Sequence, residues 1–104
     1  MDLYQALSEP KRREIIELLA RSQGLTSTDI SNNFDISAPA ISQHLKILRQ
    51  AKLVDMEKRA QSRIYTVNTA SLDELANWAT KMKERWEHRF NRLDEVLEDL
   101  KENT

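Results

Sequence analysis

Residues 71–101 carry an unbroken helical pattern, and no other feature constrains the fold of this chain as strongly. The segment contains neither Pro nor Gly, and Ser71 with Glu74 predicts a capping box at its start. About 30 residues at a rise of about 1.5 Å each span about 45 Å, whereas a compact domain of about 100 residues is only about 35 Å across. We therefore expect this helix to extend beyond its own domain.

An apolar stripe runs along this helix at spacings of three and four: Leu72, Leu75, Ala79, Met82, Trp86, Phe90, Leu93, Val96, Leu97 and Leu100. With Trp78 beside it, the stripe is too long for residues 1–68 to cover, and a second subunit is the simplest cover. Two alternatives stay open. The helix could fold back on its own core with a break near Glu87 and His88, or a small apolar ligand could sit near Trp78, Met82 and Trp86.

Residues 37–50 predict a second amphipathic helix, with Ser37 as its N-cap. At 100° per residue its core-facing stripe consists of Ala38, Ile41, Leu45 and Leu48. The opposite side consists of Pro39, Gln43, Lys46 and Gln50, and none of these is acidic. Glutamine can pair with adenine, serine can bond a base or a phosphate, and lysine adds positive charge. This face is typical of a helix that enters a DNA groove.

The segment before this helix completes a helix-turn-helix pattern. A short first helix is expected over residues 2–7 and a second after Pro10, with Gly24 just past its end. Thr26 and Asp29 resemble a capping box and predict a third helix over residues 27–33. A turn of three or four residues, in which Phe34 and Ile36 can pack into the core, then leads into the helix over residues 37–50. In a helix-turn-helix this second helix is the recognition helix.

The residues after the recognition helix change to an alternating pattern. Segments 53–58 and 63–68 predict two β-strands, and residues 59–62 form a basic tip between them. A hairpin in this position is a wing, expected over residues 53–68. Because the tip lacks the glycine that the tightest hairpin turns favour, we expect a longer, mobile loop there.

Composition and charge narrow the class of protein. The 104 residues are expected to form one domain, mainly α with a small β hairpin: a winged helix-turn-helix with a long C-terminal dimerisation helix over about residues 71–101. Residues 36–63 carry six basic and two acidic side chains, whereas residues 71–104 carry six basic and nine acidic ones. The middle of the chain therefore suits a polyanion and the tail does not.

The sequence also argues against several classes of protein and of binding site. The absence of cysteine excludes disulfides and thiolate metal sites. No apolar run approaches the length of a membrane span and no signal peptide is recognised, so we expect a cytoplasmic protein with no membrane partner. No Gly-rich phosphate loop occurs, and neither histidine has a carboxylate at the spacing of an acid-base pair, so we expect no enzymatic activity.

The sequence resembles the ArsR/SmtB family of bacterial winged-helix repressors over about residues 4–100. The segments that carry this resemblance are residues 6–16, 37–48, 53–54 and 63–65. It implies a homodimer, assembled through the first and last helices, that places its recognition helices in successive major grooves of a palindromic operator in double-stranded DNA. The implied DNA contacts are Ser37, Pro39, Ala40, Ser42, Gln43, His44 and Lys46, with Arg59, Gln61 and Arg63 on the wing.

Arg49 and Lys58 add expected phosphate contacts. The expected dimerisation residues are Leu3, Leu7, Leu75, Trp78, Met82, Trp86, Phe90 and Leu93. The metal-sensing residues of the family are missing, because no cysteine is present and no His follows Asp73 by two positions. We therefore expect no metal ion and no cofactor, and the sequence identifies no small-molecule effector.

Two alternatives stay open for the site. His44 could be a residue at the edge of the core that bonds to the backbone instead of a DNA contact. The whole chain could also be a protein-interaction module that uses the winged helix as a scaffold and the long helix to recruit a partner. The basic excess in residues 36–63 favours DNA, since a module that binds only proteins does not need it.

Overall fold

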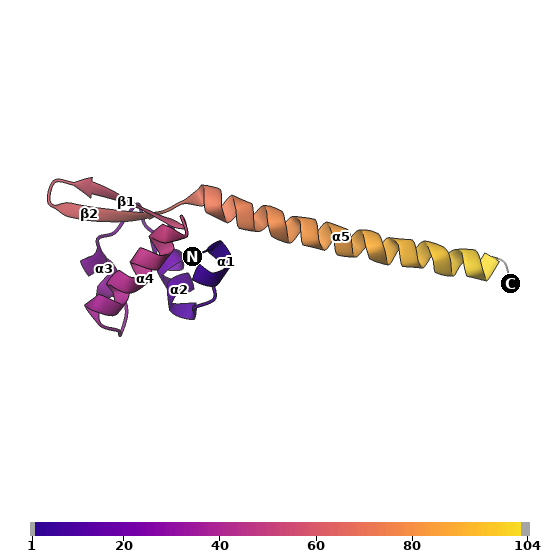
Figure 1. The fold of residues 1–104 in the computed structure, drawn as a ribbon, viewed down its shortest axis with the longest axis horizontal. Coiled ribbons are helices and arrows are strands. Elements are labelled where there is room, and N and C mark those ends of the chain that lie inside the picture. Colours follow the sequence, from indigo (N-terminus) through magenta and orange to yellow (C-terminus); the bar gives the residue numbers. More distant parts are fainter. Residues whose placement is uncertain (1, 103–104) are drawn as a thin grey trace. The chain divides into compact units, whose positions relative to one another are not determined.

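The computed structural model describes residues 2–102. The chain divides into two compact units, the first ending at Leu72 and the second beginning at Asp73. The helices and strands, labelled in Figure 1, are α1 (Leu3–Ala6), α2 (Pro10–Ala20), α3 (Ser27–Ser31), α4 (Ala38–Gln50), β1 (Val54–Arg59), β2 (Ser62–Val67) and α5 (Thr69–Glu102). The predicted fold class, mainly helical with one hairpin and a long last helix, is confirmed. None of the described helices is both long and apolar enough to cross a bilayer.

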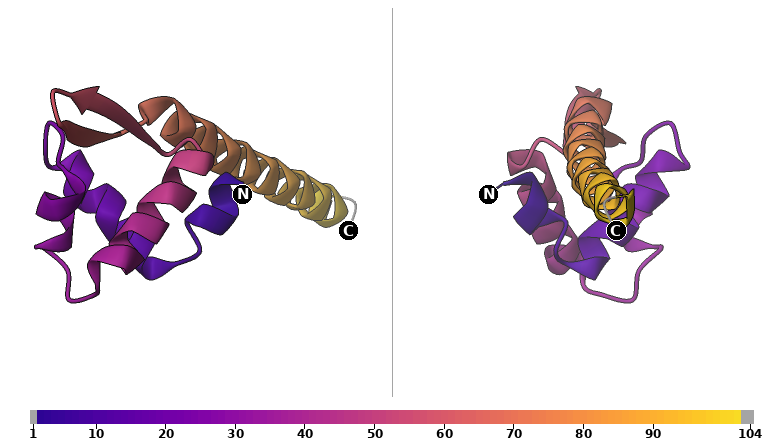
Figure 2. Two further views of the ribbon diagram at one scale, coloured as in Figure 1. Left: turned by 60° about the vertical axis from the view of Figure 1, so that its left-hand side comes forward. Right: turned by 90° about the vertical axis from the view of Figure 1, so that its right-hand side faces the viewer.

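The first unit gathers its short helices on one side of the hairpin, as the views in Figures 1 and 2 agree. Its core is built from the apolar faces of the helices and the base of the hairpin: Ile15, Leu19, Ile30, Ile41, Leu45, Leu48, Leu53 and Val54. The predicted stripe of α4 is therefore confirmed except for Ala38, which is exposed. Ala38 is the first residue of α4, and the contacts of this helix with the core begin at Ile41.

The capping box predicted before α3 is present. The Thr26 hydroxyl accepts a hydrogen bond from the Asp29 amide at 3.1 Å, and the Asp29 carboxylate accepts one from the Thr26 amide at 3.2 Å. Because α3 ends at Ser31, the turn before α4 covers residues 32–37 and is longer than expected. Phe34 and Ile36 in this turn are half-buried.

The two strands pair in antiparallel register from Val54 opposite Val67 to Arg59 opposite Ser62. Only Ala60 and Gln61 therefore form the turn, and the longer loop expected there is wrong. Ala60 adopts a φ of 54°, the conformation that a tight turn needs and that glycine usually supplies. The prediction failed because alanine can occupy this conformation at a cost of about 1 kcal/mol, which strand pairing outweighs.

The end of α4 contains a similar conformation. The Leu53 amide donates to the Leu48 carbonyl at 2.9 Å and the Lys52 amide to the Arg49 carbonyl at 3.0 Å, which is the Schellman arrangement. Lys52 has a φ of 62° at the position where glycine is favoured. Its carbonyl accepts a hydrogen bond from the Ser71 hydroxyl, which ties the end of α4 to the start of α5.

Lys52→Gly is therefore expected to stabilise the fold. Removing the Cβ relieves the left-handed strain, and we expect the free energy of unfolding to rise by about 1 kcal/mol. Urea unfolding followed by circular dichroism measures the change. Lys52→Ala is the matched control, because it removes the same charge but keeps the Cβ. An equal gain in both variants would assign the effect to charge and contradict the conformational explanation.

The sequence predicts that Gly24 lies just past the end of α2, and this prediction is wrong. α2 ends at Ala20 with Arg21 as its C-cap, and Gly24 lies further along, where the chain approaches β2. Its neighbour Leu25 exchanges two backbone hydrogen bonds with Tyr65, at 3.1 and 2.8 Å. A Cβ on Gly24 would lie 2.6 Å from Ile64 Cγ2, so the glycine lets the chain reach this strand.

Gly24→Ala is expected to destabilise the fold. Gly24 has a φ of +132° in addition to the close approach to Ile64, so a side chain is strained in both respects. We expect a loss of about 2–3 kcal/mol in the free energy of unfolding, measured by thermal and urea denaturation. The exposed neighbour Gln23 provides the control: Gln23→Ala should change stability by less than about 0.5 kcal/mol. A neutral Gly24→Ala would show that β2 shifts without cost.

α5 is continuous from Thr69 to Glu102, so the structure does not have the alternative break near Glu87 and His88. The capping box predicted at Ser71 is wrong. The Asn68 side chain caps the helix, since its Oδ1 accepts from the Ala70 amide at 3.0 Å and the Ser71 amide at 3.4 Å. The Ser71 hydroxyl instead donates to the Lys52 carbonyl. The helix therefore begins two residues earlier than the sequence indicated.

Candidate nucleic-acid interface

The outer face of α4 consists of exposed polar side chains because its apolar residues at spacings of three and four are turned into the core. Pro39, Ser42, Gln43, Lys46, Arg49 and Gln50 are all exposed. The helix contains no acidic residue. Within the described part of the chain, neither Lys46 nor Arg49 forms an ion pair. This face thus presents two uncompensated cations, two amides and a hydroxyl.

The start of α4 uses one of its predicted contacts internally. The Ser37 hydroxyl accepts a hydrogen bond from the Ala40 amide at 3.3 Å and so caps the helix, as predicted. Its own proton is left for another acceptor, because a hydroxyl both donates and accepts. Ala40 is half-buried and Pro39 is exposed.

His44 does not lie on the exposed face with Gln43 and Lys46. It is half-buried, and its Nδ1 lies 3.4 Å from Nη1 of Arg12 on α2. Burial lowers the pKa of His44, and the neighbouring Arg12 guanidinium lowers it further. His44 therefore lies at the edge of the core, but its partner is a side chain and not the backbone that the alternative named. Its contact with DNA stays a prediction.

The basic run at the start of α2 also serves the fold. Arg12 and Arg13 donate hydrogen bonds to carbonyls at the end of α1, and Lys11 pairs with Glu14 at 3.0 Å. Lys11 also lies over the ring of Phe34, 5.4 Å from its centroid. These cations are less available to an external anion than those of α4.

The wing carries two cations directly opposite each other. Lys58 on β1 pairs in register with Arg63 on β2, and both side chains are exposed. Like charges in this position destabilise a hairpin. Arg59, in contrast, forms an ion pair with Glu57 at 3.2 Å, and Gln61 lies in the exposed turn. The Lys58–Arg63 pair is therefore a concentration of positive charge on the wing without an ion pair among the described residues.

The helix and the wing meet in a shallow depression between the end of α4 and β1. Its lining combines Lys46, Arg49 and Gln50 of α4 with Val54, Asp55 and Met56 of β1. The two free cations of α4 therefore lie beside the base of the wing. This arrangement forms one polar surface from α4 to the hairpin, with positive charge in excess.

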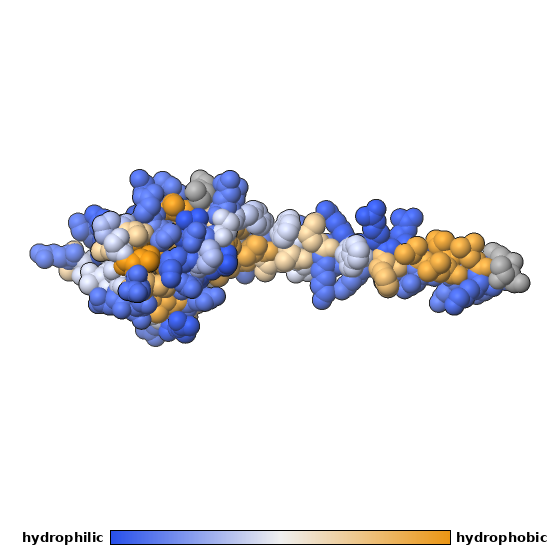
Figure 3. All heavy atoms as spheres, turned by 90° about the horizontal axis from the view of Figure 1, so that it is seen from below, coloured by the Kyte–Doolittle hydropathy of each residue, from blue (hydrophilic) through white to orange (hydrophobic). Residues whose placement is uncertain are grey.

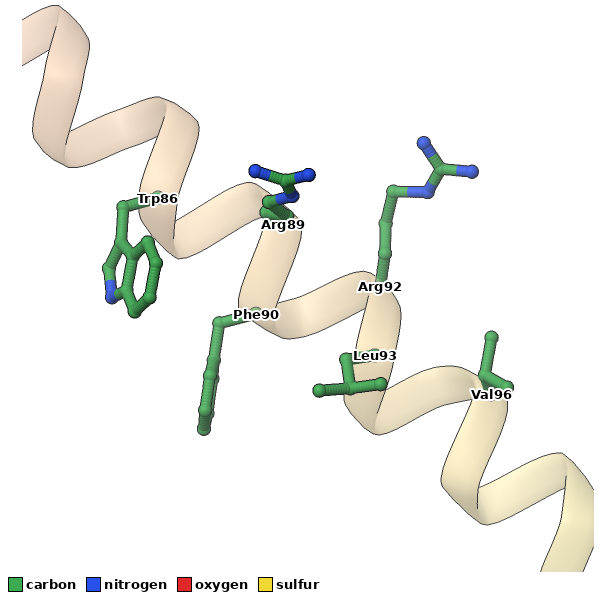
Figure 4. Close-up of a pocket in the computed structure, with 6 residues that line it drawn as sticks. All are labelled: Trp86, Arg89, Phe90, Arg92, Leu93 and Val96. Atoms are coloured by element: carbon green, nitrogen blue, oxygen red, sulfur yellow. The ribbon is translucent and has the colours of Figure 1, made fainter.

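The apolar stripe of α5 is exposed from Trp86 to Leu100, and Trp78 beside it is exposed as well. The exposed fractions are 51% for Trp78, 69% for Trp86, 54% for Phe90 and 55% for Leu93. Figure 3 shows apolar residues gathered toward the C-terminal end of α5. In Figure 4, Trp86 and Phe90 project from one side of the helix, and Arg89 and Arg92 project from the other. An isolated chain would leave these large apolar side chains in water.

The other residues expected at a dimer contact differ in exposure. Leu75 and Met82 on α5 and Leu7 after α1 are half-buried. Leu3 is only 7% exposed because α1 packs its apolar side into the first unit. Leu3 therefore has little surface left for a partner.

Comparison with known proteins agrees with this geometry. The family model described as "Bacterial regulatory protein, arsR family" matches residues 9–56, which include the helix-turn-helix and the start of the wing. The transcriptional repressor SdpR of Bacillus subtilis is 39% identical over 74% of this chain and 84% of its own length. The chain belongs to the ArsR family. It is accordingly a DNA-binding transcriptional regulator and not an enzyme.

Two further comparisons extend the match. An arsenical resistance operon repressor of Staphylococcus xylosus is 34% identical over 68% of this chain and 67% of its own length. An ArsR-like transcriptional regulator from Rhodococcus sp. RHA1 has a TM-score of 0.81, with 24% identity over 90% of this chain and 88% of that one. The second likeness supports the fold alone. The ArsR-family resemblance seen in the sequence is confirmed.

A metal site is not evident in this ArsR-family chain. Within residues 2–102, no three His, Asp or Glu side chains lie close enough together to hold a metal ion, and the sequence has no cysteine. Sequence reasoning missed one participant at the interface. Arg12 contacts His44 across 32 positions of the chain, and no local pattern signals such a contact.

Gln43→Ala is expected to relax base preference at one position of each half-site. The Gln43 amide is exposed in the middle of α4, and a bidentate amide-adenine pair discriminates by about 1–3 kcal/mol against other bases. Competition binding with single-base operator variants measures the change. Gln50→Ala is the matched control, because it removes the same group from the last turn of α4. Relaxed preference in Gln50→Ala alone would contradict the assignment.

Proposed function

We propose that this ArsR-family regulator represses transcription by binding a palindromic operator as a homodimer. The two copies of α4 enter successive major grooves, and each wing contacts the adjacent backbone. Gln43 and Ser42 read bases, while Lys46, Arg49, Lys58 and Arg63 neutralise phosphates. Occupation of the operator blocks access to the promoter.

One observation carries the DNA-binding part of the proposal: α4 and the wing hold four exposed cations without an acidic partner in residues 2–102. The basic run of α2 and Arg59 of the wing are, in contrast, paired or bonded within the protein. The grouping of Lys46, Arg49, Lys58 and Arg63 on α4 and the adjacent wing, without an acidic partner in residues 2–102, favours a polyanion as the partner of this surface.

The stripe of α5 supports the homodimer, since each copy would cover the other's apolar residues. The charges of α5 also suit a second copy. Residues 81–92 carry five basic and two acidic side chains, whereas residues 94–102 carry one basic and five acidic ones. Antiparallel pairing of this part of α5 would place the acidic segment of one copy against the basic segment of the other. Parallel pairing would oppose like charges.

Selection of duplexes from a randomised pool by the full-length protein tests the proposal. We expect an enriched palindrome whose half-sites are centred about 10 base pairs apart. If the dimer neutralises about 6–10 phosphates, affinity for this duplex should fall by about 10³ to 10⁵ between about 50 and 200 mM salt. Failure to enrich any duplex, or an affinity independent of salt, would overturn DNA binding. Self-association without DNA binding would support the protein-interaction module instead.

A further inference from the structure

Arg12 contacts two elements with a single guanidinium group. Its Nε donates to the Ala6 carbonyl at 2.7 Å and its Nη2 to the Gln5 carbonyl at 3.4 Å, both in α1. Its Nη1 lies 3.4 Å from Nδ1 of His44, on the flank of α4. Arg12 itself belongs to α2. The side chain therefore joins α1, α2 and the recognition helix.

The chemistry of the two groups assigns the protons in this contact. A guanidinium has only donors, so Nδ1 of His44 must be the acceptor. The imidazole is then neutral, and its single ring proton lies on Nε2. A protonated His44 would present a second donor to Arg12 and lose this bond.

The surroundings of His44 favour the neutral ring. Burial is the first cause of its lowered pKa, and the charges of Arg12 and then Lys11 act in the same direction. Glu9, the N-cap of α2, acts in the opposite direction and raises the pKa. The net effect keeps His44 able to accept from Arg12 near neutral pH.

We propose that Arg12 is a positioning residue for DNA binding: it joins the carbonyl end of α1 to α4 through His44 and holds His44 with its proton on Nε2. The proposal rests on the function proposed above. We assign it an indirect effect on DNA, because the side chain is half-buried and directs three of its five N–H groups at acceptors inside the protein. Loss of Arg12 lets α4 and the His44 ring shift relative to α1.

The adjacent residue offers a matched control. Arg13 carries the same charge on the same turn of α2, and its Nη1 donates to the Leu7 carbonyl at 2.6 Å. Among the described hydrogen bonds, Arg13 makes none to α4. Arg12→Gln and Arg13→Gln therefore remove the same charge. Arg12→Gln removes two bonds to α1 and the contact with His44, whereas Arg13→Gln removes one bond near the end of α1.

Affinity for the selected duplex distinguishes the two variants. We expect Arg12→Gln to weaken binding by about tenfold more than Arg13→Gln, as for loss of a charge-assisted hydrogen bond. The salt dependence should stay that of the wild type in Arg12→Gln, because Arg12 is not itself a phosphate contact. Equal affinities in the two variants would overturn the proposal. A salt slope reduced by about one per protomer would also overturn it, by making Arg12 a phosphate ligand.

Nitrogen-15 NMR of the His44 ring gives a readout that general loss of stability would not move. We expect the proton on Nε2 in the wild type and in Arg13→Gln, and a mixture of tautomers in Arg12→Gln. The pKa of His44 should rise toward its ordinary value in Arg12→Gln, because a neighbouring cation is removed. A wild-type ring with its proton on Nδ1 would exclude the contact. If the wild type binds no duplex but shows the expected tautomer, the proposed function fails and the Arg12–His44 contact stands.

Discussion

Leu93→Asp is expected to raise the dissociation constant of the homodimer by about 10⁴. Leu93 is 55% exposed in the single chain and lies in the stripe that a second copy would cover. The change removes a buried leucine and introduces a carboxylate, at a cost of about 3 kcal/mol. A two-fold dimer contains the substitution twice, so the cost is about 6 kcal/mol, or about 10⁴ in the dissociation constant. Analytical ultracentrifugation over a concentration series measures the change.

Asn91→Asp provides the matched control. It adds the same charge within the same turn of α5, but residues 91 and 93 lie about 200° apart around the helix. We expect this variant to dimerise like the wild type. DNA affinity should fall with dimerisation in Leu93→Asp, because each monomer presents only one recognition helix. A fully dimeric Leu93→Asp protein would show that another surface holds the two copies together, and would overturn the assigned interface.

The helices and the hairpin could be predicted because their signals are local. In α4, burial recurs at the helical period from Ile41 to Leu48, so the sequence alone shows which side is buried. The capping box of Thr26 and Asp29 lies within four residues of chain and forms as predicted. β1 likewise pairs with β2, the strand that follows it directly in the sequence, so the hairpin could be predicted from two neighbouring segments. These elements needed no information about the rest of the fold.

The errors arose where a distant partner decides the local structure. Ser71 matches a capping residue, but its hydroxyl bonds to the Lys52 carbonyl, and Asn68 caps α5 instead. Gly24 resembles a helix end, yet its lack of a side chain is needed because Ile64 lies against it. Neither Lys52 nor Ile64 is adjacent in the chain, so the sequence pattern could not report these contacts.

The candidate site likewise has features that the sequence predicts and features that depend on distant contacts. Exposure of Gln43 and Lys46 follows from the helical period and agrees with the prediction. The engagement of His44 by Arg12 depends on how α2 packs against α4 and could not be foreseen. Charge counting also overstated the wing, because Arg59 is paired with Glu57. Contact of these residues with DNA stays a prediction.

Removing Lys58 and Arg63 together is expected to weaken DNA binding and to stabilise the free protein. The Lys58→Ala/Arg63→Ala variant loses two phosphate contacts per protomer, or four per dimer, so the logarithmic salt slope should fall by about 3.6. Between about 50 and 200 mM salt, the loss of affinity should then be about 150-fold smaller than in the wild type. The hairpin should gain up to about 1 kcal/mol, because the two side chains are like charges directly opposite each other.

The opposite signs of these two effects make the test specific. A residue pair kept for the fold would lower both stability and binding when it is removed, whereas a pair kept for an anion should lower binding alone. Lys81→Ala/Lys83→Ala on α5 removes the same number of charges and is the control for net charge. At protein concentrations that keep both proteins dimeric, its salt slope should match the wild type within about one unit. Its stability should fall by less than about 0.5 kcal/mol, since only the exposed Lys83–Glu87 pair is lost within the chain. Only the Lys58–Arg63 pair places like charges opposite each other on paired strands. An equal loss of salt slope in both double variants would therefore show that total charge, and not the wing, determines the affinity for DNA.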